Sequence, residues 1–264
     1  MMKQDPASSR GIKARLLSGR SALCCLANMG SPVAAEILGH AGYDAVMIDM
    51  EHGPGDVLNT VAQLQALGGT PAAALVRVPE NAPVYLKRVL DAGPQGVMIP
   101  AVATQVDAER AVAACRYPPR GIRGVAHPIA RASNYGMNLD RYIGETEKNL
   151  LVICQVETMP GVDNAAEIAA TDGVDMIFIG PMDLSASAGH FNEPDHPDID
   201  ALMKRIEGNV HAAGKMLGGL ATPGRPAAQL FDRGYRLVID AIDIALLRDA
   251  ARRNVEAVKS YTGQ

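Results

Sequence analysis

The sequence contains no tryptophan and only 3 phenylalanines among its 264 residues, so aromatic side chains cannot dominate its core. Hydrophobic residues still make up 48% of the chain and include 12 methionines, which predicts an aliphatic core in a globular protein. No apolar run approaches the roughly 18–20 residues that a membrane-spanning helix needs. The first twenty residues are charged and lack an apolar secretory segment, so we expect a cytoplasmic protein.

Basic patches and metal-binding cysteine motifs are also missing. The formal net charge is −4 and no block of lysine or arginine stands out, which argues against nucleic acid or an anionic membrane as a partner. The 4 cysteines lack the spacing of a zinc site, so we expect free, buried thiols. No G-x-G-x-x-G motif opens a helix after a strand, and we expect no organic cofactor.

Short, nearly continuous apolar runs alternate with amphipathic stretches along the whole chain. Such runs are typical of parallel strands that are covered on both faces. They span residues 22–27, 45–50, 73–78, 96–102, 150–157, 175–180, 215–221 and 235–241. Eight strands that alternate with helices predict a parallel (β/α)₈ TIM barrel, with an open doubly wound sheet as the alternative.

We expect a single domain over residues 1–264, in which residues 1–20 form a flexible or peripheral segment. The long final helix is expected to pack against a neighbouring subunit. Residues 116–149 form a connection that is long for a compact domain, and such connections are usually functional. We expect this connection to fold partly over the barrel mouth, where His127 and Arg131 could face the substrate.

Ionisable and amide side chains gather where the predicted strands end, and barrel enzymes carry their chemistry at that end. Each has an ordinary alternative: an arginine at a strand end is often a surface ion-pair partner, Asp183 could cap a helix, and His52 could be an exposed turn residue. Their convergence on one mouth predicts a site. The residues concerned are Asp49, Glu51, His52, Arg77, Gln155, Glu157 and Asp183.

The chemistry of these groups suits an enolate. Two hard carboxylates, Glu157 and Asp183, favour a divalent cation such as Mg²⁺ or Mn²⁺. Arg77 would stabilise negative charge that develops on a substrate oxygen, and His52 would act in proton transfer near neutral pH. A Schiff-base mechanism needs a lysine at a strand end, and Lys215 lies instead near the start of a strand.

Six segments of the chain resemble the HpcH/HpaI aldolase family in the same order, over about residues 20–260. They are IDMEHGP, LVRVPEN, VLDAG, RYPPRGIRGV, VICQVET and FIGPMDLSASAGH. The resemblance implies a carbon–carbon lyase of the class II pyruvate aldolase type, acting in the breakdown of aromatic or sugar acids. It also implies a homohexamer with exchanged C-terminal helices, and cleavage of a 4-hydroxy-2-oxo acid to pyruvate and an aldehyde.

The resemblance assigns roles to residues of this chain. Glu157 and Asp183 resemble the ligands of a divalent metal ion, Mg²⁺, Mn²⁺ or Co²⁺. Asp183 also belongs to the substrate-binding set, with Gln155 and the backbone N–H of Met182. His52 resembles the general base and Arg77 the group that stabilises the transition state. We expect Asp49 and Glu51 to orient His52 or a nearby water without binding the metal.

Asp91, in the VLDAG segment, resembles the carboxylate that raises the basicity of His52. It lies near the end of a helix that should run away from the mouth, so we expect it to reach the site of a neighbouring subunit. The alternative is that Asp91 is only a helix-end residue. Residues 22–30 read ALCCLANMG where family members often have a tryptophan, and this difference bears on which aldehyde is accepted.

Two other functions remain open at this point. The same enolate would form in oxaloacetate decarboxylation or a related carbon–carbon cleavage, and a panel of substrates would separate these from the aldolase. A barrel that only binds a keto acid or assembles without catalysis is the non-enzymatic alternative.

Overall fold

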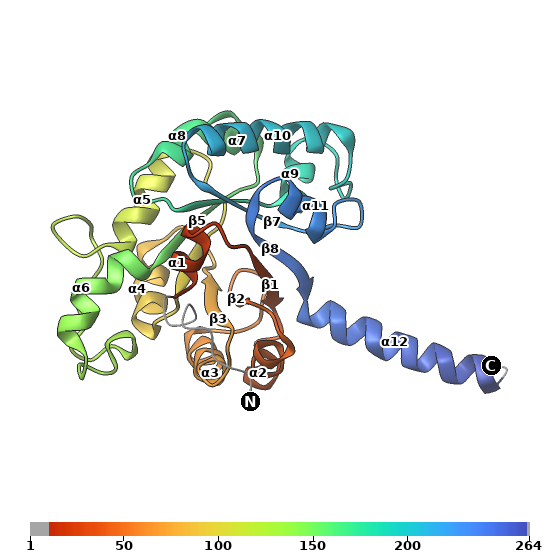
Figure 1. Cartoon of the computed structure of the whole chain (residues 1–264), viewed down its shortest axis with the longest axis horizontal. Coiled ribbons are helices and arrows are strands. Elements are labelled where there is room, and N and C mark those ends of the chain that lie inside the picture. Colours follow the sequence, from red (N-terminus) through yellow and green to blue (C-terminus); the bar gives the residue numbers. More distant parts are fainter. Residues whose placement is uncertain (1–10, 263–264) are drawn as a thin grey trace.

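The computed structural model describes residues 11–262, and its eight strands close into a barrel in sequence order (Figure 1). Every neighbouring pair is parallel, including β1 with β8, which completes the closure. The strands are β1 (Ala22–Ala27), β2 (Ala45–Asp49), β3 (Ala73–Arg77), β4 (Gly96–Ile99), β5 (Leu151–Val156), β6 (Met176–Ile179), β7 (Met216–Leu220) and β8 (Tyr235–Ile242). The predicted (β/α)₈ barrel is confirmed, and each predicted apolar run coincides with one strand, of which only β8 extends beyond its run, by one residue.

Helices surround the barrel and return the chain from the end of one strand to the start of the next. Local sequence fixes their ends: Ser31 caps α2 through the N–H of Ala34, and Thr104 with Asp107 forms a capping box on α5. The helices are α1 (Gly11–Leu17), α2 (Pro32–Ala41), α3 (Val57–Leu67), α4 (Pro83–Ala92), α5 (Gln105–Cys115), the 3₁₀ helix η2 (Arg131–Ser133), α6 (Leu139–Asn149), α7 (Met159–Asp163), α8 (Ala165–Ala170), α9 (Pro181–Ser187), α10 (Pro197–Ala212), α11 (Ala227–Asp232) and α12 (Asp243–Thr262).

The core has two layers because successive residues of a strand point to opposite faces. In β3, Leu75 faces the inside of the barrel and Val76 faces the surrounding helices, and both are fully buried. All four cysteines are free and buried, as predicted. Burial raises the pKa of Cys25 and that of Cys115 to about 12, so these thiols are unreactive near neutral pH.

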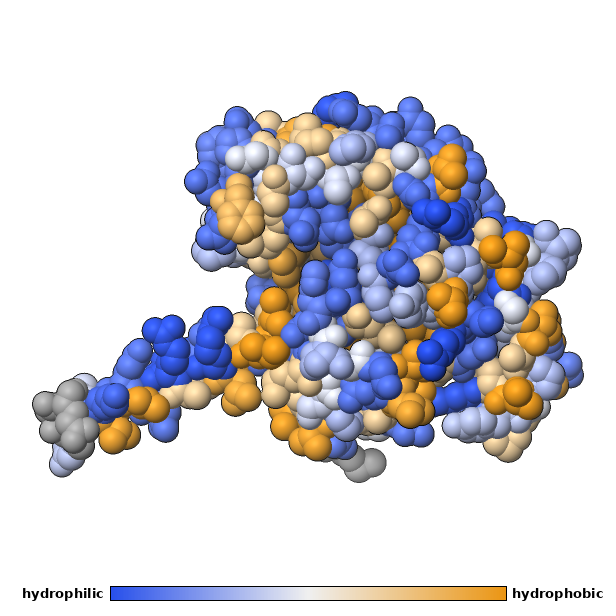
Figure 2. All heavy atoms as spheres, turned by 180° about the vertical axis from the view of Figure 1, so that it is seen from behind, coloured by the Kyte–Doolittle hydropathy of each residue, from blue (hydrophilic) through white to orange (hydrophobic). Residues whose placement is uncertain are grey.

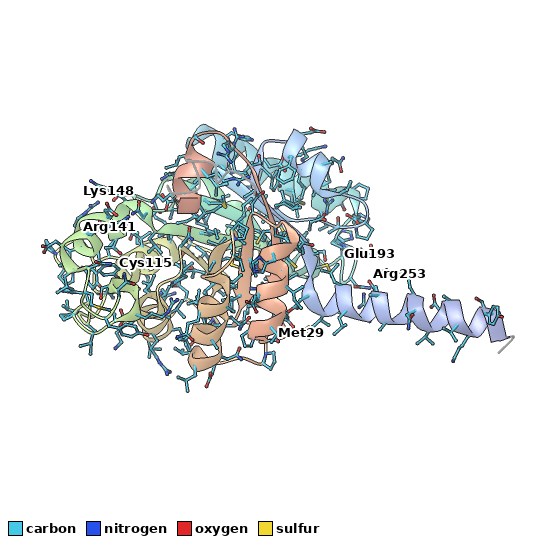
Figure 3. The ribbon with its side chains drawn as sticks, turned by 60° about the horizontal axis from the view of Figure 1, so that its bottom comes forward. Met29, Cys115, Arg141, Lys148, Glu193 and Arg253 are labelled. Carbon is cyan, nitrogen blue, oxygen red and sulfur yellow. The ribbon has the colours of Figure 1, made fainter. Side chains whose placement is uncertain are left out.

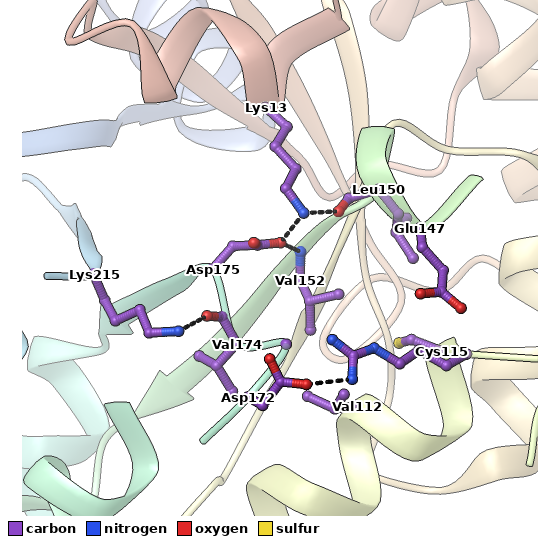
Figure 4. Close-up of a pocket in the computed structure, with 12 residues that line it drawn as sticks. Lys13, Val112, Cys115, Glu147, Leu150, Val152, Asp172, Val174, Asp175 and Lys215 are labelled. Atoms are coloured by element: carbon purple, nitrogen blue, oxygen red, sulfur yellow. Dashed lines mark hydrogen bonds and ion pairs between the residues drawn. The ribbon is translucent and has the colours of Figure 1, made fainter. Parts of the chain in front are cut away.

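Helix α1 closes the barrel at the end where the strands begin. Ile12 and Leu16 are buried in the interior layer, and Lys13 Nζ lies 3.0 Å from the Leu150 carbonyl and 2.8 Å from Asp175 (Figure 4). The expectation of a flexible or peripheral segment is therefore wrong for residues 11–17, because two apolar side chains in one helical face can be buried against the barrel. Residues 18–20 form an exposed turn that leads into β1, and residues 1–10 lie outside the described residues.

The long connection 116–149 lies at the same closed end, away from the mouth. Arg131 donates to the carbonyls of Ala92, at 2.6 Å, and Leu64, at 3.4 Å, near the ends of α4 and α3. The expectation that this connection folds over the mouth is wrong within one chain. The connection runs from the last residue of α5 to the first residue of β5, and both of these residues lie at the end of the barrel opposite the mouth.

Helix α12 projects from the barrel (Figure 1). Its first residue, Asp243, accepts hydrogen bonds from the backbone N–H groups of Asn28 and Met29 after β1. Figure 3 shows Met29 beside the start of α12, with Arg253 farther along the helix. Figure 2 shows apolar side chains among the charged ones on this helix. The exposed aliphatic residues of α12 are Ile244, Leu246, Leu247, Val255 and Val258. Among residues 11–262, no helix combines the length and apolar character needed to span a bilayer.

Candidate active site

A cavity of about 370 Å³ opens at the end of the barrel where the strands finish. Its apolar walls include Phe178 and Ile239 from the strands and Ile244 from α12. The polar residues that line it come from segments far apart in sequence and are Asn28, Asp49, His52, Arg77, Gln155, Asp183 and Arg248. Five of the seven strand-end residues predicted to converge line this cavity, and Glu51 and Glu157 lie behind them, in contact with Arg77 and Gln155.

Asp49 organises one side of this cavity. Its carboxylate accepts from Arg77 Nε at 2.9 Å and Nη2 at 2.8 Å, and from the Asn28 amide at 2.9 Å. It also accepts from the backbone N–H groups of Glu51, at 3.0 Å, and His52, at 3.4 Å, which shapes the turn after β2. Although burial opposes the charged form, the bonds and charge of Arg77 hold the pKa of Asp49 below its usual value.

Glu51 lies between the arginine and the histidine. Its Oε2 is 2.9 Å from Arg77 Nη1 and 3.7 Å from His52 Nε2. The His52 side chain is 62% exposed, so it is open to water and to a substrate in the cavity. Burial, together with the charges of Asp49 and Asp183, raises the pKa of Glu51 although Arg77 opposes this. Asp49 thus fixes the position of the His52 backbone through a hydrogen bond, while the carboxylate of Glu51 lies near the imidazole ring of His52.

Glu157 is, with Asp49, a buried carboxylate of the site. Its Oε1 accepts from the backbone N–H of Ala101 at 2.8 Å, and its Oε2 accepts from the side-chain amide of Gln155. Burial raises the pKa of Glu157 to about 7, and the charges of Glu51 and Asp183 add to this effect. Ala101 has a φ of 53°, unusual for a residue with a side chain, and this backbone turn aims its N–H at the carboxylate.

These residues fit a hard divalent cation. Carboxylate and amide oxygens are the ligands that Mg²⁺ and Mn²⁺ prefer, and Gln155 Oε1 is buried without a hydrogen-bond partner in the described structure. A Cβ at Gly180 would come within 2.7 Å of Glu157 Oε2, so glycine leaves this oxygen accessible. Positive charge would also relieve the repulsion that raises the pKa of Glu157.

Asp183 and Met182 lie in the first turn of α9, directly after β6. Both line the cavity, and Met182 is partly exposed. The first N–H groups of a helix have no partner within the helix, so the Met182 N–H is available to a bound anion. Their position at the mouth could be predicted from the sequence, because both residues closely follow a buried strand.

Asp91 does not reach the cavity of its own chain. It lies at the end of α4, opposite the mouth, where Arg123 Nη2 donates to it at 2.9 Å. His127 and Arg131 belong to the same closed end and do not line the cavity either. The hypothesis that they face the aldehyde is therefore wrong within a single chain.

Besides Arg248 of α12, sequence reasoning missed two groups of the site. Asn28 directly follows β1 and holds Asp49, so the rule applied to the other strands could have found it. Ala101 offers only its backbone N–H, and no side-chain signal marks it. A second cavity, of about 230 Å³, lies at the closed end, where the lining cations Lys13, Arg116 and Lys215 are bonded to protein oxygens (Figure 4).

Comparison with known proteins agrees with this geometry. A family model described as HpcH/HpaI aldolase/citrate lyase matches residues 23–250. The chain belongs to this family. It is 43% identical over 247 residues to a hydroxypyruvate/pyruvate aldolase of Chromohalobacter salexigens, covering 94% of this chain and 96% of that protein. It is 39% identical to a 5-keto-4-deoxy-D-glucarate aldolase of Shigella boydii, covering 98% of this chain and 100% of that protein.

Solved structures of HpcH/HpaI members share the architecture. A family protein from Burkholderia cenocepacia superposes with a TM-score of 0.89 at 40% identity, covering 94% of this chain and 98% of that chain. The curated relatives are named aldolases, so the chain is a carbon–carbon lyase of the pyruvate-aldolase type that acts on a small molecule. The non-enzymatic alternative is thereby set aside.

Proposed function

We propose that this HpcH/HpaI member reversibly cleaves a 4-hydroxy-2-oxo acid to pyruvate and an aldehyde with the help of a divalent metal ion. The observation that carries the proposal is the buried Glu157, with its raised pKa, bonded to Gln155 in the wall of a cavity that also presents Asp183, Arg77 and His52. A carboxylate cluster beside a cation and an imidazole is suited to forming and quenching an enolate.

Glu157 and Asp183 would hold the ion, which we expect to be Mg²⁺, Mn²⁺ or Co²⁺. When bound, the ion supplies Lewis-acid charge opposite the keto oxygen. We assign Gln155 and the Met182 N–H, whose residues line the cavity, to binding the pyruvate half of the substrate. Arg77 carries more N–H donors than Asp49 and Glu51 use, so it can also donate to an oxygen on which negative charge develops.

His52 is the group that we assign to proton transfer. Its exposed ring can take the proton of the 4-hydroxyl group, directly or through water, as the C3–C4 bond breaks. The electron pair of that bond passes to the pyruvate enolate, which Arg77 faces, and a proton then returns to C3. Glu51 is near enough to orient the ring, and Asp49 fixes the turn that carries it.

We also propose that the enzyme is a homo-oligomer, a hexamer by family resemblance, in which Asp91 of one subunit supports His52 of another. Asp91 lies at the closed end of its own barrel, so only a neighbouring subunit could bring it to a mouth. The projecting α12, with its exposed apolar residues, is suited to exchange between subunits. We keep the cytoplasm as the expected compartment because all four cysteines are free.

Decarboxylation of oxaloacetate is the second candidate, because it passes through the same enolate. The aldolase is favoured by His52, since a decarboxylation needs no base at a 4-hydroxyl group, and by the aldolase names of the curated relatives. The value of kcat/KM for oxaloacetate, compared with that for 4-hydroxy-2-oxo acids, separates the two.

Replacement of Glu157 by glutamine tests the metal site. We expect Glu157→Gln to lose both turnover and high-affinity Mn²⁺ binding, measured by calorimetry on stripped protein, while the fold is retained. Glu109→Gln, on the outer surface of α5, is the matched control and should change neither. A Glu157→Gln enzyme that binds Mn²⁺ like the wild type would reject the assignment.

A further inference from the structure

The loop between α9 and α10 gathers a set of metal-binding side chains outside the mouth cavity. His190, Glu193 and His196 each offer one ligand atom, and these atoms all lie within 4.8 Å of one another. Glu193 is labelled in Figure 3. None of the three residues lines the mouth cavity. The set is therefore separate from the carboxylates that we assign to the catalytic ion.

The backbone of this loop explains why residues three positions apart meet. The N–H of Glu193 donates to the His190 carbonyl at 3.0 Å, and the N–H of His196 donates to the Glu193 carbonyl at 3.0 Å. Asn192 has a φ of 62° between these two turns, in the left-handed region that asparagine adopts more readily than most residues. The two successive turns bring the imidazole rings of His190 and His196 into a stack, with centroids 3.8 Å apart.

Asp198, in the first turn of α10, lies close to both imidazoles. Its Oδ2 is 3.2 Å from His190 Nε2 and 3.7 Å from His196 Nδ1. Glu193 Oε2 is 3.8 Å from Nδ1, the other ring nitrogen of His190. His190 can therefore donate its Nε2–H to Asp198 and present Nδ1 beside Glu193, which is the carboxylate–histidine–metal arrangement of protein metal sites. His196 also has a structural role, because its Nδ1 accepts from the Asp198 N–H at 3.2 Å and caps α10.

The donor atoms and their exposure suit a transition-metal ion. Bonds of about 2.0–2.2 Å place tetrahedral ligands about 3.4 Å apart, so modest side-chain rotations bring these donors to bonding distance. The Glu193 side chain is 63% exposed and the two histidines are partly exposed, so an ion can enter from water. Imidazole suits Zn²⁺, Cu²⁺ and Ni²⁺, whereas Mg²⁺ prefers oxygen ligands.

We propose that His190, Glu193 and His196 bind a divalent transition-metal ion of the Zn²⁺ class. Asp198 orients His190, and water completes the coordination. The ion fastens the loop that follows α9, the helix whose first turn contributes Met182 and Asp183 to the mouth cavity. The site does not depend on the proposed aldolase activity, and neither assignment requires the other.

Titration of stripped Glu157→Gln protein with Zn²⁺ isolates this site from the catalytic one. We expect calorimetry to detect about one Zn²⁺ per chain with a Kd of about 10 µM or tighter. The bound ion should raise the Tm, and an excess of Mg²⁺ should not displace it. Cu²⁺ at the same site should show the nitrogen hyperfine coupling of imidazole ligands in its EPR spectrum.

Substitutions in the Glu157→Gln background identify the ligands. His190→Ala should abolish both the binding and the rise in Tm. His196→Asn should do the same while it keeps a side-chain acceptor for the cap of α10. Asp198→Asn should weaken the affinity by about 10–100-fold. His40→Ala, which removes an exposed histidine of α2, is the matched control and should bind Zn²⁺ like its parent.

The wild-type chain provides an independent measurement. There His190→Ala and His196→Asn should lower the bound Zn²⁺ from about two ions per chain to about one, and should leave pyruvate release with Mg²⁺ unchanged. Zn²⁺ binding that is absent from the Glu157→Gln protein, or that both histidine substitutions leave unchanged, would overturn the site. An EPR spectrum that shows only oxygen ligands would do so as well.

Discussion

Asp49 and Arg77 form a two-point ion pair at the mouth of the barrel, with Nε–Oδ1 and Nη2–Oδ2 distances of 2.9 and 2.8 Å. The Asp49 side chain has no exposed surface, and that of Arg77 is 11% exposed. Both bonds fix the plane of the guanidinium, so the arginine is oriented before a substrate arrives. Asp49 therefore acts on Arg77 as well as on the backbone of His52.

Arg77→Lys keeps the charge but not this two-point geometry. We expect kcat/KM to fall by about 10²–10³-fold, because the donor that opposes the developing oxygen charge is displaced. Arg77→Ala should in addition cost about 3–5 kcal/mol of unfolding free energy, since it leaves Asp49 buried without its partner. Arg110→Ala, which breaks the exposed pair with Asp107, is the control. An Arg77→Lys enzyme with wild-type kinetics would contradict the role.

Metal affinity should depend on pH through Glu157. Its pKa of about 7 in the metal-free protein means that a cation must displace a proton at lower pH. Affinity should therefore weaken by about tenfold for each pH unit below about 7 and level off above it. Calorimetry in buffers of different ionisation heat would detect the released proton, and affinity that stays constant down to pH of about 5.5 would contradict this.

The same pKa predicts how the stability of the stripped protein changes with pH. Because the folded pKa of Glu157 lies above its usual value of 4.5, its protonated form favours the folded state. This contribution is complete below about pH 4.5 and is lost as the pH rises through about 7. Glu157→Gln should not show the loss, so the difference in unfolding free energy between variant and wild type should grow over that range. A difference in unfolding free energy that stays constant over this pH range would contradict the raised pKa of Glu157.

Subunit mixing can locate Asp91. His52→Ala and Asp91→Ala proteins should each be nearly inactive. If the pair spans two subunits, co-assembled oligomers should recover activity at about a quarter of their sites, because some sites then combine an intact His52 with an intact Asp91. If the two residues act within one chain, mixing would recover nothing, and if Asp91 only ends a helix, Asp91→Ala alone would stay active.

Shortening α12 tests its part in assembly. A chain that ends after Arg253 loses Val255 and Val258 but keeps Asp243 and Arg248. We expect sedimentation to show a smaller assembly, because exposed apolar residues on a projecting helix are suited to cover by another subunit. The exposed Arg252–Glu256 pair provides the control, since its removal by alanine substitution should leave the mass unchanged. An unchanged mass for the shortened chain would contradict the assignment.

The barrel and most of the mouth could be predicted because both depend on local patterns. Strands such as 22–27 are short apolar runs between helical patterns, and residues that follow parallel strands meet at one edge. His52, Arg77 and Asp183 were found in this way. The bond of Asn28 to Asp49 was not predicted, because β1 is followed by an amide side chain and not by an ionisable group.

Other features depend on contacts that a linear pattern does not contain. The length of 116–149 indicated a special role, but its position follows from where α5 ends and β5 begins. The N–H of Ala101 reaches Glu157 only because the backbone turns there with a positive φ. Arg248 belongs to the cavity because Asp243 anchors α12 beside β1.

The most direct test of the account is pyruvate release from a small panel of 4-hydroxy-2-oxo acids, assayed with stripped protein before and after Mg²⁺, Mn²⁺ or Co²⁺ is added back. We predict pyruvate release only when a divalent ion is present. Equal release from stripped and reloaded protein would contradict the roles assigned to Glu157 and Asp183.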